Sequence, residues 1–162
     1  MPLTVKGWTL LFHDMMIGQM RNLADACFRA RAADPDGYRS NANVRVLAAI
    51  AKLVLHNIPD DPGRSEHRLG NTMGEDYRHW SRAKFGSRFR LFFRYDTTAR
   101  IIVFAWVNDE KTLRARGSRS NPYAVFKAML GRDNPSDNWK TLLAAAKDLP
   151  DDILGSMQDI TK

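Results

Sequence analysis

The stretch that decides the fold is residues 88–95, which read RFRLFFRY. Side chains along a β-strand point alternately to the two faces of the sheet. The odd positions are apolar: Phe89, Leu91, Phe93 and Tyr95. The even positions carry Arg88, Arg90, Phe92 and Arg94. The alternation predicts one face packed on a core and one solvent face, on which three arginines surround an aromatic ring able to stack an unpaired base.

Two further strands are expected beside this one. Residues 79–85 carry Arg82 and Lys84 on alternate positions and reach a turn at Gly86. Antiparallel pairing through that turn places both basic rows on the same solvent face. Residues 100–107, RIIVFAWV, are apolar on both faces, which is typical of a central strand covered on both sides.

Periodic apolar residues and turn formers predict the remaining elements. They are a strand at 7–12, helices at 14–32 and 41–57, a long loop at 59–77, a helix from Pro122 to Leu130, and a last helix capped by Asp137. Residues 150–162 are expected to form a loose tail. The length of 162 residues favours one domain.

The positive charge of the chain is concentrated in one segment. Residues 78–119 hold eleven Lys or Arg against three acids, whereas the rest of the chain is close to neutral. A solvent face can carry basic residues for solubility alone, but acids would then be interleaved, and only Asp96 occurs among residues 78–100. The pattern favours a phosphate-bearing partner, nucleic acid before a membrane surface.

The common catalytic sets of nucleases are not visible in the sequence. Metal-dependent nucleases need clustered carboxylates, and Asp109–Glu110 is the only adjacent acidic pair near the basic strands. The four histidines have no metal-ligand spacing, and the single Cys27 has no evident histidine partner. RNA can instead supply its own nucleophile, the 2′-hydroxyl, if fixed cations stabilise the phosphorane.

Three motifs of the chain closely resemble the YhaV-type toxins of the RelE superfamily. They are WSRAKFGSRFRLFFRY at 80–95, NDEKTLRARG at 108–117 and YAVFKAML at 123–130. The resemblance implies an α+β, RelE-like fold with helices packed on one face of a small, mainly antiparallel sheet. It implies a toxin domain at residues 1–140, followed by a C-terminal helix and tail at 141–162.

The resemblance also implies a function. Such a chain would be the toxin of a type II toxin–antitoxin system: a ribosome-dependent, metal-independent mRNA endoribonuclease of the cytoplasm, with no cofactor. Its expected partners are a PrlF-like antitoxin with an AbrB-type DNA-binding domain, the ribosome and mRNA, and operator DNA through the antitoxin complex. No membrane contact is expected.

Four catalytic residues are carried over from the resemblance. Lys84 would be the general base, Arg90 the transition-state stabiliser, Arg114 the group that protonates the leaving 5′-oxygen, and Tyr123 the residue that stacks or orients the substrate base. Arg116 lies two residues from Arg114 and competes for its role. RNA phosphates would be bound by Arg82, Arg88, Arg94 and Arg116. RelE itself has lysine at the position of Arg82, and arginine is a poor proton acceptor, which favours Lys84 as base.

Two other functions need the same basic face. One is a non-catalytic nucleic-acid-binding protein, such as an operator co-repressor acting with its antitoxin. The other is an accessory protein that uses its charge to dock on ribosomes. Neither requires the combination of Lys84, Arg114 and Tyr123.

Overall fold

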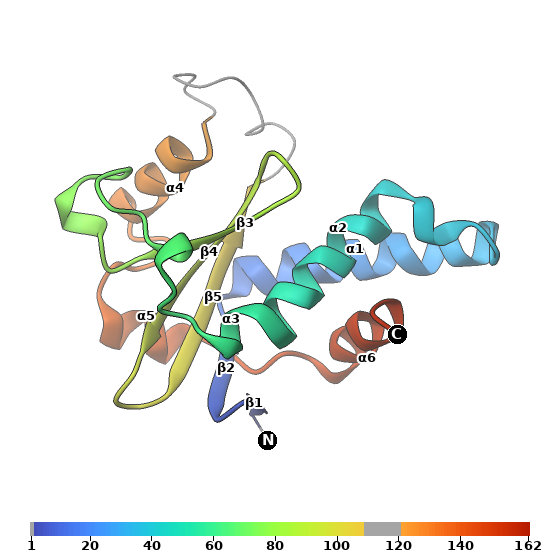
Figure 1. The fold of residues 1–162 in the computed structure, drawn as a ribbon, viewed down its shortest axis with the longest axis horizontal. Helices are drawn as coiled ribbons and strands as arrows, with labels where there is room; N and C mark the ends of the chain where they lie inside the picture. Colours follow the sequence, from blue (N-terminus) through green and yellow to red (C-terminus); the bar gives the residue numbers. More distant parts are fainter. Residues whose placement is uncertain (1, 109–120) are drawn as a thin grey trace.

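A five-stranded mixed sheet forms the centre of the molecule (Figure 1). The computed structural model describes residues 2–108 and 121–162. The strands are β1 (Leu3–Val5), β2 (Trp8–Phe12), β3 (Ser81–Phe85), β4 (Phe89–Asp96) and β5 (Ile101–Val107). Their order in the sheet is β1-β2-β5-β4-β3. The expected strands at 7–12, 79–85, 88–95 and 100–107 are therefore confirmed, and β5 is central as its apolar sequence predicts.

The pairing of the strands is mainly antiparallel. β1 pairs with β2, β4 with β5, and β3 with β4 in the antiparallel sense. β2 and β5 are parallel. The β4–β5 register shifts between Phe92 and Phe93, so a bulge in β5 lies beside the middle of β4.

Six α-helices are found in the described residues. They are α1 (Asp14–Ala33), α2 (Ala42–Lys52), α3 (Ile58–Asp60), α4 (Pro122–Gly131), α5 (Trp139–Ala145) and α6 (Asp151–Ile160). A π-helical turn, η2 (Leu53–Asn57), joins α2 to α3. The expected helix from Pro122 is confirmed as α4, and Asn121 caps it, since the Tyr123 N–H donates to Oδ1 of Asn121. Asn138, and not the expected Asp137, caps α5. His13 caps α1, which begins at Asp14.

One hydrophobic core lies between the sheet and the pair α1 and α2. The odd-numbered residues Leu91 and Phe93 of β4 are completely buried there, as their alternation predicts. α6 packs against α1 and α2 and contributes Ile153 and Met157 to the same core. The expectation of a loose tail at 150–162 is wrong, because apolar residues spaced four apart bury one side of this helix.

A second core covers the opposite face of the sheet. α4 and α5 lie on that side, across the sheet from α1, α2 and α6 (Figure 1). Phe92 is completely buried and stacks on Phe126 of α4, with ring centroids 4.3 Å apart. The expectation of helices on one face is therefore wrong, and Phe92 is not available to stack a base.

The loop at 59–77 is packed against the sheet. It contains short 3-10 turns, η3 (Ser65–His67) and η4 (Glu75–Tyr77). Leu69 and Met73 insert into the second core, and Arg68 forms an isolated β-bridge with Ser81 at the edge of β3. The loop thereby brings its own polar groups beside the basic strands. None of the described helices is both long and apolar enough to cross a membrane.

Candidate active site

The hydroxyl of Tyr123 lies between two arginines of the sheet. The Nε–H groups of Arg82 and Arg90 each donate to the phenolic oxygen, both at 3.0 Å. Proline at the first position of α4 and the Asn121 cap fix the start of the helix that carries Tyr123. A phenolic oxygen accepts two hydrogen bonds and donates one. With both acceptor positions used by arginine, the O–H remains as a donor.

Arg82 is held from the opposite side by the loop. Its Nη1 donates to the backbone carbonyls of Arg68 at 2.8 Å and Glu66 at 3.3 Å. The guanidinium also lies over the Tyr123 ring, 5.9 Å from its centroid. Three elements, β3, α4 and the loop, therefore fix one side chain.

Arg90 is positioned through both its side chain and its backbone. Its Nη1 donates to the carbonyl of Phe89 at 2.9 Å. Its backbone N–H donates to Oδ1 of Asn108 at 2.6 Å, and Nδ2 of Asn108 donates to the carbonyl of Arg88 at 3.0 Å. Asn108 is 2% exposed. It therefore fixes the end of β5 to the start of β4.

Gln19 of α1 supports the end of β5 from the face of the sheet that α1 and α2 cover. Its side-chain amide donates to the carbonyl of Val107 at 2.5 Å and accepts from the Val107 N–H at 3.1 Å. These two hydrogen bonds fix Val107, the last residue of β5, directly before Asn108. Residues 109–120 then follow, so Arg114 and Arg116, both expected at the site, lie outside the described residues.

Lys84 lies directly opposite Arg90 in the β3–β4 ladder. The predicted sharing of one face by Arg82, Lys84 and Arg90 is thus confirmed by the register. Like charges in directly opposite positions destabilise a sheet. Among the described residues, no ion pair involves Arg82, Lys84, Arg88 or Arg90. Their charges therefore remain available to an anionic ligand.

Arg94 has a different environment. Its guanidinium lies between Trp80 and Trp139, 5.8 Å and 5.3 Å from the ring centroids. Its Nη1 donates to the carbonyl of Asp137 at 2.6 Å, and burial lowers the pKa of the group from its ordinary value. These contacts give Arg94 a packing role between β4 and the start of α5. Contact between Arg94 and RNA stays a prediction, as it does for the exposed Arg88.

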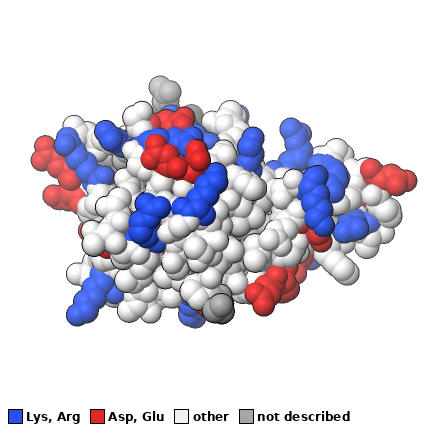
Figure 2. All heavy atoms as spheres, turned by 60° about the horizontal axis from the view of Figure 1, so that its bottom comes forward, with Lys and Arg blue, Asp and Glu red and all other residues white. Residues whose placement is uncertain are grey.

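Surface charge elsewhere is mixed. On the face drawn in Figure 2, basic and acidic side chains lie side by side at several places on a largely uncharged surface. Such interspersed charge is ordinary for a protein surface. The unpaired cations of β3 and β4 differ from it in having no described carboxylate partner. Among the described residues, no group of three or more His, Cys, Asp or Glu side chains is placed to hold a metal ion.

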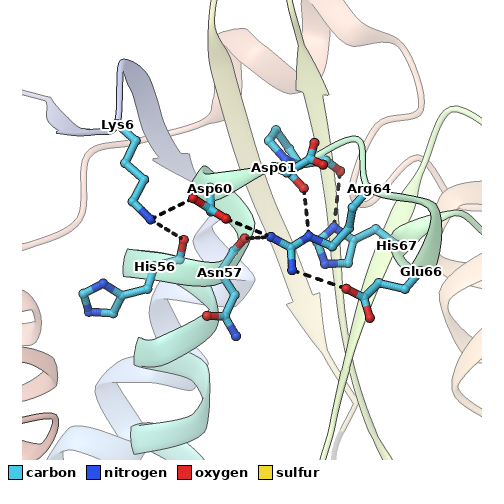
Figure 3. Close-up of polar contacts among 9 residues, drawn as sticks. Lys6, His56, Asn57, Asp60, Asp61, Arg64, Glu66 and His67 are labelled. Carbon is cyan, nitrogen blue, oxygen red and sulfur yellow. Dashed lines mark hydrogen bonds and ion pairs between the residues drawn. The ribbon is translucent and has the colours of Figure 1, made fainter.

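Arg64 organises the part of the loop that supports Arg82 (Figure 3). It forms ion pairs of 3.3 Å with Asp60 and with Glu66, and donates to the carbonyl of Asn57 at 3.1 Å. Lys6 also pairs with Asp60, at 3.2 Å. These contacts connect the end of the α2–α3 segment to the turn whose carbonyls accept from Arg82.

His67 anchors the turn η3 to the sheet. It is 5% exposed, its Nδ1 is 3.3 Å from the carbonyl of Pro62, and its ring meets the edge of Phe93. Burial lowers the pKa of His67 from its ordinary value. The neutral ring therefore belongs to the packing of the loop.

Sequence reasoning missed the residues that position the arginines. Gln19 and Asn108 are single polar residues whose partners are backbone groups far away in the chain, and Arg64 lies in a polar loop. One signal was present for Asn108, since it follows directly on the continuous apolar run 101–107. A polar residue at the end of a buried strand is a candidate for closing the backbone hydrogen bonds there.

The comparisons with known proteins point to one family. Residues 10–147 match a family model described as a toxin with endonuclease activity, of a toxin-antitoxin system. The chain is 36% identical over 143 residues to the ribonuclease toxin YhaV of Escherichia coli strain K12, covering 87% of this chain and 93% of that relative. The toxin YhaV of Escherichia coli O157:H7 matches equally well. No solved structure matches the chain.

Proposed function

The chain belongs to the YhaV family of toxins with endonuclease activity, and on that premise we propose that its substrate is messenger RNA engaged on the ribosome. We propose further that cleavage needs no metal ion and uses the 2′-hydroxyl of the RNA as nucleophile. The observation that supports this chemistry best is the Tyr123 hydroxyl held by Arg82 and Arg90, with Lys84 opposite Arg90.

The proposed reaction is a transesterification. The 2′-oxygen forms a bond to the adjacent phosphorus while Lys84 takes its proton. The bond between phosphorus and the 5′-oxygen breaks, and that oxygen leaves with a proton from Arg114, which lies outside the described residues. The products carry a 2′,3′-cyclic phosphate, or a 3′-phosphate after ring opening, and a 5′-hydroxyl. An amine can act as a base at Lys84, whereas a guanidinium cannot.

Arg90 is proposed to stabilise the phosphorane. Its guanidinium is already fixed by Tyr123 and by the Phe89 carbonyl, so little reorganisation accompanies the build-up of negative charge. Its Nη2 has no hydrogen-bond partner among the described residues. A guanidinium in a fixed orientation is well suited to a phosphate oxygen.

Tyr123 is proposed to act mainly through its hydroxyl. The ring meets Phe92 edge-on and Arg82 on its face, and the O–H is the free donor of the cluster. Such a donor could orient a non-bridging phosphate oxygen beside Arg90. Stacking of an RNA base on the remaining exposed part of the ring is the other proposal for this residue. Arg82, Arg88 and Arg116 would bind neighbouring phosphates.

A toxin of a toxin–antitoxin system has an antitoxin partner. We propose that this partner is PrlF-like with an AbrB-type DNA-binding domain, that the complex binds operator DNA, and that the toxin acts in the cytoplasm. We propose also that the fold is a RelE-like variant. The three antiparallel strand pairings support this, and the second helical layer of α4 and α5 would be its departure from the expected one-sided arrangement.

The end chemistry of the products tests the proposal. Incubation with translating ribosomes should yield fragments with 5′-hydroxyl ends, whereas the same mRNA without ribosomes should stay uncut. A 2′-deoxy nucleotide placed on the 5′ side of the cut should abolish cleavage at that bond. Fragments with 5′-phosphate ends, or cleavage of the 2′-deoxy substrate, would rule out the RNA as its own nucleophile.

A further inference from the structure

A pocket of about 490 Å³ lies beside the candidate active site, between the loop and the edge strand β3. Its lining includes Arg64, Glu66, Arg68, Arg82 and Lys84. Arg82 belongs to both places: its Nε contacts Tyr123, and its Nη1 contacts the carbonyls of Glu66 and Arg68 in the pocket wall. One side chain therefore connects the pocket to the proposed site of cleavage.

The charges of the pocket do not cancel. The single carboxylate of its lining, Glu66, pairs with Arg64 at 3.3 Å, and Arg64 is further occupied by Asp60 (Figure 3). Arg68 and Lys84 are exposed, and neither side chain has a hydrogen-bond or ion-pair partner among the described residues. Arg68, Lys84 and the Arg82 guanidinium therefore line one pocket without a carboxylate partner among the described residues.

The pocket also offers neutral surface. Leu53 and Ala83 supply apolar groups and Asn57 supplies an amide. Its volume is within the range of small-molecule sites, and a phosphate alone would not fill it. A ligand that presents a phosphate to the cations and an uncharged ring to the remaining wall matches this lining.

We propose that this pocket is a second RNA subsite, which binds the nucleotide next to the cleaved bond and holds its phosphate with Arg68 and Arg82. The proposal rests on the proposed function, since it assigns the substrate strand to the pocket. It makes Arg68 a binding residue that lies outside the proposed catalytic set. It also gives a role to the contacts of Arg64 with Asp60 and Glu66, since they fix the part of the loop that carries Arg68.

The salt dependence of RNA binding tests the subsite. The ligand is a fully 2′-O-methylated RNA oligonucleotide, which has no free 2′-hydroxyl, and its affinity is measured at several salt concentrations. Each phosphate contact in a single strand contributes about 0.7 to the slope of log K against log salt. Arg68→Ala should lower the magnitude of the slope by about 0.7 and weaken binding, and Arg68→Lys should restore most of the slope.

The matched control is Arg29→Ala, which removes an exposed arginine of α1 that does not line the pocket. An unchanged slope in this control supports a specific contact at Arg68. Equal slope changes in both variants, or no binding by the parent chain, would overturn the subsite. So would an Arg68→Ala variant that loses affinity for the antitoxin but not for the oligonucleotide, because the pocket would then be a protein contact.

The same variants separate this proposal from the proposed function. If the parent cuts mRNA on ribosomes and Arg68→Ala leaves the slope unchanged, only the subsite fails. If the slope depends on Arg68 but the parent produces no cuts, the subsite stands and the catalytic assignment fails.

Discussion

Arg82 donates its Nε–H to the hydroxyl of Tyr123 at 3.0 Å and thereby connects the edge strand β3 to helix α4. Arg90 of β4 donates to the same oxygen at the same distance. The contact joins two neighbouring strands to a helix whose Tyr123 lies more than thirty residues from either arginine along the chain. It gives the basic face a defined centre.

Replacement of Tyr123 by phenylalanine should lower the rate of RNA cleavage by about tenfold or more, because hydrogen bonds involving charged groups contribute about 1.5–3 kcal/mol. The ring and its edge contact with Phe92 remain in this variant. The measurement is cleavage of mRNA on purified ribosomes, with Tyr123→Ala alongside. Full activity of the phenylalanine variant together with an inactive alanine variant would favour base stacking over the hydroxyl role.

Asn108→Ala should reduce the free energy of unfolding by about 1–3 kcal/mol, because it leaves the Arg90 N–H and the Arg88 carbonyl without their partner. Activity should fall as well, since the start of β4 then loses its fixed position. Denaturant unfolding measures the first effect. Asn22→Ala, at an exposed position of α1, is the matched control and should change stability by less than about 0.5 kcal/mol. Equal stability of both variants would contradict the assigned role.

Arg94→Ala should destabilise the protein by about 2 kcal/mol, because it removes a guanidinium packed between Trp80 and Trp139 and leaves the Asp137 carbonyl without its donor. The effect should appear in thermal or denaturant unfolding. Binding of the 2′-O-methylated oligonucleotide should keep its salt slope. A stable variant with a reduced slope would instead place Arg94 on the RNA.

Stability should fall as the pH is lowered from 7 towards 5. Burial lowers the pKa of His67 in the folded state below its ordinary value of 6.5, so the unfolded chain takes up a proton first. The contribution of the neutral His67 to the free energy of unfolding is complete above pH 6.5 and is lost as the pH falls through the folded-state pKa. His13 acts in the same direction, since burial also lowers its pKa. Unfolding of His67→Gln across this range should have a shallower pH dependence than the parent, and an unchanged dependence would contradict it.

Alternation along residues 88–95 correctly predicted which side chains share a face, because strand geometry alone decides that. It did not predict that α4 covers part of the basic face. Phe92 lies between Arg90 and Arg94 on one face of the strand, and its burial follows from Phe126, which lies over thirty residues away along the chain. Arg94 was expected at the surface for the same reason. Local periodicity carries no information on which helix packs over which strand.

The C-terminal helix was predictable from local signals. Pro150 is followed by Asp151 and Asp152 in the first turn, and Ile153 and Met157 are spaced four apart, which are ordinary features of a helix start and its buried side. By contrast, β1 has only three residues and a pattern too short to recognise. The positioning of Arg82 by the carbonyls of Glu66 and Arg68 depends on loop geometry, which composition does not specify.

The most direct test of the proposed catalysis is to map the 5′ ends of cellular mRNA after induction of the parent chain, Lys84→Ala and Arg90→Ala, each at matched protein level. New 5′-hydroxyl ends are expected within translated reading frames for the parent and should be absent in both variants. New ends of equal abundance in both variants, or growth arrest by the parent without any new ends, would contradict the proposed catalysis.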